Sequence, residues 1–449
     1  MQIFRSDRMA TATVRLRSSS GGFVRASWIQ SGERSFAEGR EHGRLQARRS
    51  RAMLLEQTAR CYECPWRALF RFNRCARSGG VETIPGYLKG YEALYAEDPR
   101  AAAKRWFREA RYGMMVCYGI YSMVGRHEWL QYKEKIRPAT YAQLADFFTA
   151  ERFDAAAICD LAVESGMRYI NFITRHCDSF SLWATKQTTF NSVEGAPARR
   201  DLVAEMAAAC EARGLGLCLY YNHGRDWKHP HAPNNDQFGK SARPDYDPLE
   251  PTYAYGQAHD LRYYLDYMTA QITELLENYG SIAAIWLDSI HTPLTPKDAD
   301  GKVREGYEPT RDGDPFRCQE LYDHIHSLQP QVLVSYKQGY LGTEDFFAPE
   351  HKAYNRFGRS FEEVPGEICT TMMPLAGWGG GTGWGHTASF DGRHRSAETV
   401  WEVLENARTH HCNLLLNTGP LPDGSLHPED PPVLRAVGER LRAEGFPGE

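Results

Sequence analysis

Short apolar runs alternate with longer amphipathic stretches along the chain after residue 80. The apolar runs carry almost no charge, which is typical of strands buried on both faces of a parallel sheet. The stretches between them repeat apolar residues at spacings of three and four, which predicts helices. The expected strands are 113–122 (running into a loop), 168–174, 215–221, 283–288, 332–336, 367–373 and 413–417, and the expected helices are 99–111, 140–164, 201–213, 261–279, 316–328, 397–410 and 433–444.

Strands and helices that alternate without tandem strands predict a parallel sheet covered by helices. Six or seven such units over about 360 residues fit a closed (β/α)8 TIM-like barrel better than an open, doubly wound sheet. No G-x-G-x-x-G follows the first strand, and the glycine-rich stretch 377–385 is not followed by Lys and Ser/Thr. We therefore predict one α/β barrel domain over residues 81–449, with 377–385 as a flexible loop and no phosphate cradle.

Residues 1–80 differ in composition, with sixteen Arg, no Lys and six acidic residues. They are expected to form a disordered extension, or to be sequence upstream of the true start. A basic arm for nucleic acid is a further interpretation. Cys61, Cys64 and Cys75 could begin a zinc site, but no fourth ligand has suitable spacing, so no metal is expected.

Composition narrows the expected partners and compartment. A formal net charge of −4 gives no reason to expect nucleic acid or an anionic membrane as partner. No apolar run approaches the roughly 20 residues that span a bilayer, and no signal-peptide core is visible. Eleven cysteines without regular spacing argue against a disulfide framework. A cytoplasmic location is the default expectation, and export stays open if the N-terminus is mis-assigned.

Polar side chains gather where the predicted strands end. In an α/β barrel the carboxyl ends of the strands form one rim, and that rim holds the chemistry. Two carboxylates with aromatic rings around them are what a glycosidase needs. Each residue also has an ordinary structural interpretation: Asp288 as a cap, His176 as a core histidine, Glu128 as a surface acid. The candidates in strand order are His127, Glu128 and Trp129; His176, Cys177 and Asp178; Tyr220, Tyr221 and Asn222; Trp286 and Asp288; and Lys337 with Glu350.

From about residue 84 to the end, the sequence resembles glycoside hydrolase family 29, the α-L-fucosidases. The motifs that carry the resemblance occur in family order: WFREARYGMMVCYGIYS (106–122), HEW (127–129), RHCDSF (175–180), RRDLV (199–203), LYYN (219–222), WLD (286–288), FAPE (347–350) and NLLLNTGPLPDG (413–424). The resemblance implies a (β/α)8-like barrel and a retaining hydrolase that needs no metal or other cofactor. It implies Asp288 as nucleophile and Glu350 as acid/base. Sugar contacts are implied for Glu128, Trp129, His176, Tyr220 (preferred to Tyr221) and Trp286.

The sequence departs from the family pattern at several positions. Cys117 and Cys177 replace two histidines, and Lys337 stands where many members have Arg. These three side chains are still expected at the sugar site. A lost hydrogen bond to a buried hydroxyl costs on the order of 1–3 kcal/mol, so two such losses could weaken fucose binding several hundredfold or more. The sequence is not expected to include the family's C-terminal β-sandwich, which indicates either a subfamily without it or a truncated chain.

Three functional interpretations remain. The first is a retaining exo-glycosidase that removes α-L-fucose from a fucosylated oligosaccharide or glycoconjugate. The second is a catalytically weak sugar-binding relative, or a glycosidase with a shifted sugar preference. The third, an Arg-rich nucleic-acid adaptor, rests only on residues 1–80.

Overall fold

The computed structural model describes residues 84–238, 242–288, 314–375 and 383–448, together with two short strands nearer the N-terminus. The chain divides into two units, Met1–Val81 and Glu82–Glu449. In the first unit β1 (Thr13–Arg17) pairs antiparallel with β2 (Phe23–Ser27). The sequence pattern did not predict this hairpin. The rest of the predicted N-terminal extension, including Cys61, Cys64 and Cys75, lies outside the described residues.

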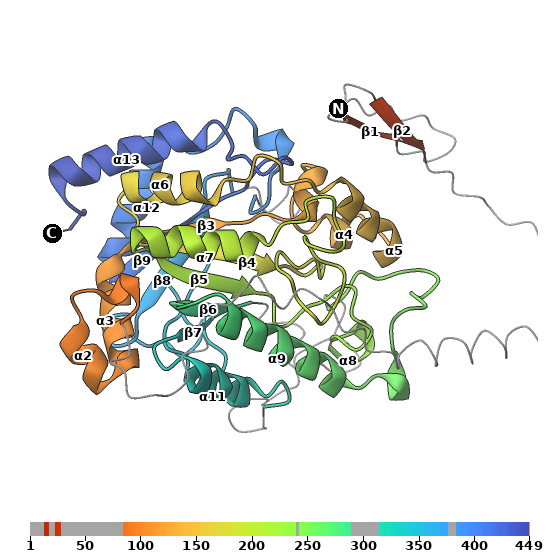
Figure 1. Cartoon of the computed structure of the whole chain (residues 1–449), viewed down its shortest axis with the longest axis horizontal. Helices are drawn as coiled ribbons and strands as arrows, with labels where there is room; N and C mark the ends of the chain where they lie inside the picture. Colours follow the sequence, from red (N-terminus) through yellow and green to blue (C-terminus); the bar gives the residue numbers. More distant parts are fainter. Residues whose placement is uncertain are drawn as a thin grey trace, which may run out of the picture. The chain divides into compact units, whose positions relative to one another are not determined.

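The second unit is built on a curled sheet of seven parallel strands in the order β7-β6-β5-β4-β3-β9-β8 (Figure 1). All seven coincide with predicted strands, and their parallel pairing confirms the expectation from the alternating pattern. The strands are β3 (Tyr112–Val116), β4 (Tyr169–Arg175), β5 (Gly216–Tyr221), β6 (Ala284–Leu287), β7 (Leu333–Tyr336), β8 (Gly366–Thr371) and β9 (Cys412–Thr418).

The sequence predicted a closed barrel of eight strands, whereas the structure has a curled sheet of seven strands whose edges, β7 and β8, do not pair with each other. Between its edge strands β7 and β8 lies segment 345–351, which forms isolated parallel bridges to both. The amide of Ala348 donates to the carbonyl of Lys337 at 2.6 Å, and Phe347 accepts from the amide of Glu367 at 2.8 Å. Pro349 supplies no N–H, so it cannot donate to this ladder, but it accepts from the amide of Cys369 at 3.0 Å and His351 donates to the carbonyl of Cys369 at 2.9 Å.

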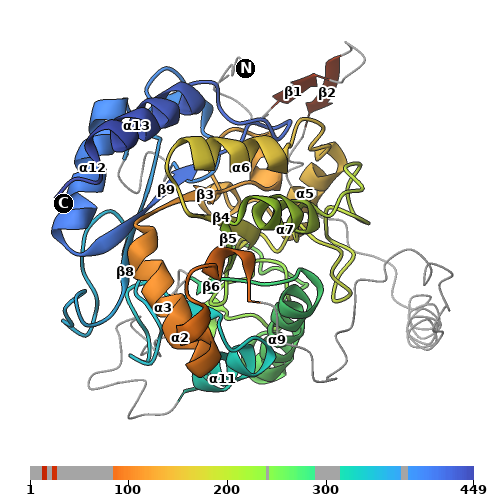
Figure 2. The same cartoon turned by 60° about the vertical axis from the view of Figure 1, so that its left-hand side comes forward.

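Helices surround the outer face of the sheet in both Figure 1 and Figure 2. α12 packs against β9, α13 packs against α12 and α6, and α11 packs against α9. No helix among the described residues is long and apolar enough to cross a membrane. The main helices are α3 (Pro99–Ala110), α6 (Ala155–Glu164), α7 (Leu202–Arg213), α9 (Leu261–Asn278), α11 (Cys318–Leu328), α12 (Ala397–Thr409) and α13 (Asp430–Glu444). Short elements are η1 (Gly86–Leu88), α2 (Glu92–Glu97), η2 (Ile120–Met123), α4 (Leu130–Lys133), α5 (Pro138–Tyr141), η3 (Ala142–Phe147), α8 (Asn235–Phe238), η4 (Gly256–Ala258) and η5 (Ala388–Phe390).

One predicted helix, 140–164, was wrong in extent. The chain forms α5 and η3 and then breaks before α6. Ala150 adopts a positive φ of 46°, and Asp154 caps α6 by accepting a hydrogen bond from the amide of Ala157. Aspartate at an N-cap starts a new helix, so the apolar spacing on either side belongs to two elements.

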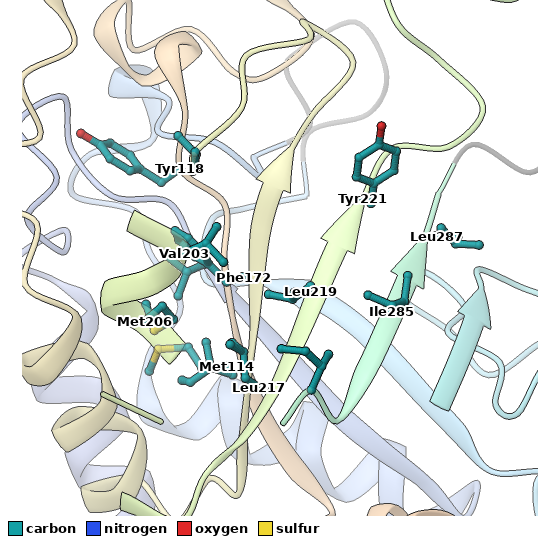
Figure 3. Packing of buried hydrophobic residues seen from close by; sticks show 14 of the residues in the cluster. Met114, Tyr118, Phe172, Val203, Met206, Leu217, Leu219, Tyr221, Ile285 and Leu287 are labelled. Carbon is teal, nitrogen blue, oxygen red and sulfur yellow. The ribbon is translucent and has the colours of Figure 1, made fainter. Parts of the chain in front are cut away.

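Alternate residues of each strand face opposite sides of the sheet. The outward residues pack against helices, as Figure 3 shows for Val203 and Met206 of α7, which lie near Phe172 of β4 and Met114 of β3. Burying an apolar side chain of this size contributes about 1.5–3 kcal/mol.

The inward residues form a second cluster inside the curled sheet. Three members of this cluster lie at or near the carboxyl ends of the strands: Cys117, Tyr220 and Trp286. Trp106 of α3 belongs to the same cluster and packs against Gly216 at the amino end of β5, where an added Cβ would lie 2.4 Å from the indole. The carboxyl ends therefore face away from α3, and the functional residues lie there.

Candidate active site

Asp288 lies at the end of β6, as predicted, and Tyr220 of the neighbouring strand β5 fixes its carboxylate. The hydroxyl of Tyr220 donates to Asp288 Oδ2 at 2.5 Å. The side-chain amide of Asn222 donates to the Tyr220 oxygen at 3.0 Å, which orients the phenol. The Asp288 side chain is 17 % exposed, so it is held from behind and still accessible at the rim.

Lys337 joins Asp288 to Glu350. Its Nζ lies 3.4 Å from Asp288 Oδ1 and 2.6 Å from Glu350 Oε1. The two carboxylate oxygens are therefore no farther apart than these two distances taken together. Two carboxylates held this close would repel one another, and the ammonium group between them offsets that repulsion. Segment 345–351, at the edge of β8, is what brings Glu350 to this position.

Aromatic rings line the site beside these charges. Trp286 stacks on Tyr220, with their ring centroids 5.4 Å apart. The His176 ring is nearly parallel to the Tyr220 ring, and the centroids of these two rings lie 5.7 Å apart. Lys337 Nζ lies 5.0 Å from the centroid of the Trp286 ring and 5.9 Å from that of Trp384. Such faces suit the apolar side of a sugar ring.

His176 is neutral at neutral pH. Burial lowers its pKa to about 4, outweighing the opposing effect of Asp288. Its Nδ1 is buried and has no hydrogen-bond partner among the residues that the structure describes. A buried imidazole nitrogen without a partner is costly, so this atom is available to hydrogen-bond a substrate hydroxyl.

The two cysteines that replace the family histidines lie close to these groups. Cys177 Sγ accepts a hydrogen bond from Asn222 Nδ2 at 3.1 Å, and Cys117 Sγ lies 3.3 Å from the hydroxyl of Tyr121. The Tyr121 ring in turn meets the edge of His176 at 5.8 Å. Burial raises the pKa of both thiols, so both stay protonated. They are weak hydrogen-bonding groups here and cannot act as thiolate nucleophiles.

Glu128 reaches the site from the other side. It is fully buried, and its Oε2 accepts from the amide of Gly385 at 2.9 Å, next to Trp384. Burial raises the pKa of Glu128 to about 7. Trp129 is one step farther out: its ring contacts Trp227 at 5.1 Å, and Trp227 donates its amide to the carbonyl of Cys177 at 2.7 Å. We expect Trp129 to belong to the rim of the site.

The structure adds Glu367, which the sequence interpretation missed. This carboxylate of β8 is fully buried inside the sheet, where Trp286 Nε1 donates to its Oε1 at 3.0 Å and the Tyr169 hydroxyl donates to its Oε2. Glu367 therefore fixes the indole on which Tyr220 stacks. An acidic residue in an otherwise uncharged buried strand (GEICTT) was the signal that could have revealed it.

Three buried acids each make a contribution to the stability of the fold that falls as pH rises. Burial raises the pKa of Glu367 to about 7, and the pKa values of Glu128 and Asp178 to about 7. In the unfolded chain such groups ionise near pH 4, so the folded chain binds more protons between about pH 4 and 7 and is favoured at the acidic end of that window.

Buried histidines whose pKa is lowered, such as His176, change the stability in the opposite direction, so the contribution of Glu367 is read from the difference between variant and wild type. Between pH 5 and pH 8, we expect the free energy of unfolding of Glu367→Gln, measured with denaturant, to rise relative to that of the wild type by on the order of 3 kcal/mol. The exposed Glu398→Gln is the matched control and should leave the pH dependence unchanged. If the free energy of unfolding of Glu367→Gln varied with pH as that of the wild type does, Glu367 would not contribute to the pH dependence.

Comparison with known proteins shows the family to which the chain belongs. The family model described as Alpha-L-fucosidase matches residues 87–446. The chain is 24% identical over 347 residues to a putative α-L-fucosidase of Caenorhabditis elegans, covering 72% of this chain and 61% of that protein. It is 26% identical to a putative α-L-fucosidase 1 of Oryza sativa, covering 65% and 51%. The chain thus spans between half and two thirds of these relatives.

Among solved structures, α-L-fucosidase isoenzyme 1 from Paenibacillus thiaminolyticus superposes with a TM-score of 0.63 at 29% identity, covering 77% of both chains. The α-L-fucosidase AlfC from Lactobacillus casei, in complex with α-L-fucose product, gives 0.60 at 25% identity, covering 76% of this chain and 98% of that one. The family model spans well over half of the sequence, and the chain therefore belongs to the α-L-fucosidase family.

Proposed function

We propose that this protein hydrolyses terminal α-L-fucosides with retention of configuration, through a covalent glycosyl-enzyme. The observation that carries the proposal is the pair of carboxylates, Asp288 and Glu350, held at one rim by a shared contact with Lys337. Retaining glycosidases keep their two carboxyl groups about 5–5.5 Å apart, whereas inverting enzymes keep them about 6.5–9.5 Å apart to admit a water. The short contacts to one ammonium group favour the retaining arrangement.

In the first step Asp288 attacks the anomeric carbon, the bond from that carbon to the leaving oxygen breaks, and Glu350 protonates the leaving oxygen. In the second step Glu350 removes a proton from water, the water oxygen bonds to the anomeric carbon, and Asp288 leaves as a carboxylate. The Tyr220 hydroxyl on Oδ2 keeps the Asp288 carboxylate in one orientation. None of these steps requires a cofactor.

The substrate class rests on the relatives. AlfC structures have been determined with α-L-fucose product, with Fucα(1,6)GlcNAc and with 4-nitrophenyl α-L-fucopyranoside. In this chain the stacked rings of His176, Tyr220 and Trp286 provide faces for a sugar. A fucosylated oligosaccharide or glycoconjugate is therefore the proposed substrate.

We also propose that segment 345–351 acts as the eighth strand of a closed barrel. The amide of Asp345 donates to the carbonyl of Val334 in β7, and the amide of Ala348 donates to the carbonyl of Lys337, which directly follows β7. On the other side, the carbonyl of Phe347 accepts from an amide of β8. Phe346 and Ala348 belong to the inward-facing cluster, as alternate residues of a barrel strand would. A strand at this place is what delivers Glu350 to the rim.

The direct test is release of 4-nitrophenol from 4-nitrophenyl α-L-fucoside, compared with the matching β-D-galactoside and α-L-galactoside. Turnover of the fucoside alone, with α-L-fucose as the first product by NMR, supports the proposal. Turnover with β-L-fucose as the first product contradicts the retaining mechanism, and turnover of a galactoside alone contradicts the sugar assignment.

One observation favours an alternative, a sugar-binding relative with weak activity or a shifted sugar preference. Cys117 and Cys177 are neutral thiols engaged with Tyr121 and Asn222, so they offer the sugar little hydrogen bonding. Absence of turnover on all three glycosides, with fucose still raising the unfolding temperature, supports the binding relative. Replacing Cys177 by His should then strengthen fucose binding.

Lys337→Met tests the link between the carboxylates. Removing the cation leaves Asp288 and Glu350 to repel one another, so we expect kcat/KM to fall by about 10–10²-fold. Lys337→Arg keeps the charge and should keep kcat/KM close to wild type. An unchanged kcat/KM in Lys337→Met would show that the cation does not offset the repulsion between the two carboxylates.

A further inference from the structure

A second group of imidazoles and carboxylates lies where the loop after β8 meets the start of α13. Ligand atoms of His394, His427 and Asp430 all lie within 4.8 Å of one another. The cluster is buried: the side chains of His394 and Asp430 are 2 % and 0 % exposed, and that of His427 is 5 % exposed. None of these residues takes part in the site around Asp288.

The hydrogen bonds of His394 leave one ring nitrogen unused. Its Nδ1 lies 2.6 Å from Asp430 Oδ1, and its Nε2 is buried without a hydrogen-bond partner among the described residues. A metal ion that displaced the proton shared between Nδ1 and Oδ1 would meet an imidazole nitrogen and a carboxylate oxygen. Thr418 at the end of β9 donates to the other oxygen of Asp430 at 2.6 Å, which fixes that carboxylate.

Two more carboxylates flank His427. Its Nε2 lies 3.3 Å from Asp391 Oδ1, and its Nδ1 lies 3.6 Å from Glu429 Oε1. Within the described part of the chain, no Lys or Arg is paired with Asp391, Glu429 or Asp430. Apart from the two imidazoles themselves, no cationic side chain among the described residues balances these three acids.

We propose that His394, His427 and Asp430 bind a divalent transition metal ion, with zinc as the best match. Zinc prefers imidazole nitrogen and carboxylate oxygen, and three protein ligands can hold it. The imidazole rings lie 4.2 Å apart with an angle of 29° between their planes. Both rings can face one ion if His427 turns, and its partner Asp391 is half exposed and free to follow.

Such an ion would brace the segment that carries Trp384 and Gly385. Gly385 donates to Glu128 in the candidate active site, and the neighbouring His386 lies 6.0 Å from the His427 ring. Metal binding would therefore stabilise this part of the rim without touching the substrate.

The test uses the full chain without an affinity tag, stripped with a chelator and then dialysed against Zn²⁺ or Co²⁺. We expect the wild type to bind one ion more than His427→Gln, with affinity at that site lowered at least about 100-fold in the variant. Visible absorption of bound Co²⁺ should be lost in Asp430→Asn as well. Exposed His411→Gln is the matched control. Comparing wild type with variant removes any contribution from Cys61 and Cys64.

Zn²⁺ should also raise the unfolding temperature of the wild type and of His411→Gln, and not that of His427→Gln. Circular dichroism checks that each variant is folded. Equal metal content in wild type and His427→Gln would overturn the proposal. So would a wild type without Co²⁺ absorption or thermal shift, in which case the cluster is held by shared protons alone.

Discussion

Asp288→Ala is expected to lower turnover of α-L-fucosides by on the order of 10³-fold or more, while the fold is kept. The carboxylate supplies the bond to the anomeric carbon in the glycosyl-enzyme, and no neighbour can replace it. Cys117 and Cys177 are neutral thiols, and the Tyr220 phenol has its pKa raised by burial and by Asp288 itself. The Asp288 side chain is partly exposed at the rim, so its loss removes little packing.

Rescue by azide makes this prediction specific for a nucleophile. Azide can enter the space left by Asp288→Ala and attack the anomeric carbon from the same face, giving a fucosyl azide of inverted configuration. Exposed Glu134→Ala is the matched control, because Glu134 pairs with Arg126 at the surface. Fucose should still raise the unfolding temperature of Asp288→Ala. Undiminished turnover, or an inactive variant that azide does not rescue into β-fucosyl azide, would assign the nucleophile elsewhere.

The helix–strand pattern predicted most of the fold because the outward face of each strand is packed against a helix. α7 is the clearest case. Asp201 caps its start, Gly214 ends it with a φ of 65°, and the predicted range differs by one residue. Local signals of this kind need no knowledge of distant contacts.

Segment 345–351 could not be predicted as a strand, because its pairing depends on β7 and β8 and not on its own pattern. Pro349 lacks the N–H that a strand residue donates, and the apolar run 346–348 is short and follows two acids, Glu344 and Asp345. Its place between the edge strands becomes visible only when the sheet curls. The position of Glu350, which depends on this segment, was therefore less certain from sequence than that of Asp288.

The candidate site was predicted at the level of residues that follow strands. The structure brings five of these residues into one connected set of contacts: Asp288, Lys337, Glu350, Tyr220 and Trp286. The supporting residues Glu367 and Tyr121 were missed as site residues, because their role is to hold other side chains in place. Such a role follows from contacts between strands, which no local pattern encodes.

Glu350→Gln is expected to separate substrates by their leaving group. A sugar leaving oxygen needs a proton, so hydrolysis of Fucα(1,6)GlcNAc should fall by about 10²–10⁴-fold. 4-Nitrophenolate leaves with little help, so the first step on the nitrophenyl fucoside should be slowed far less. The second step needs Glu350 as base, so the variant should release a burst of nitrophenol followed by slow turnover.

Glu128 is the carboxylate that could take the role of the acid instead. Burial raises its pKa to about 7, which suits a proton donor at neutral pH, and it lies near enough to Glu350 for their charges to interact. Its Oε2 is already occupied by the Gly385 amide, however, whereas the Glu350 side chain is 38 % exposed at the rim. We therefore expect Glu128→Gln to slow both substrates alike by weakening sugar binding. The opposite pattern, a burst in Glu128→Gln and equal losses in Glu350→Gln, would move the acid/base role to Glu128.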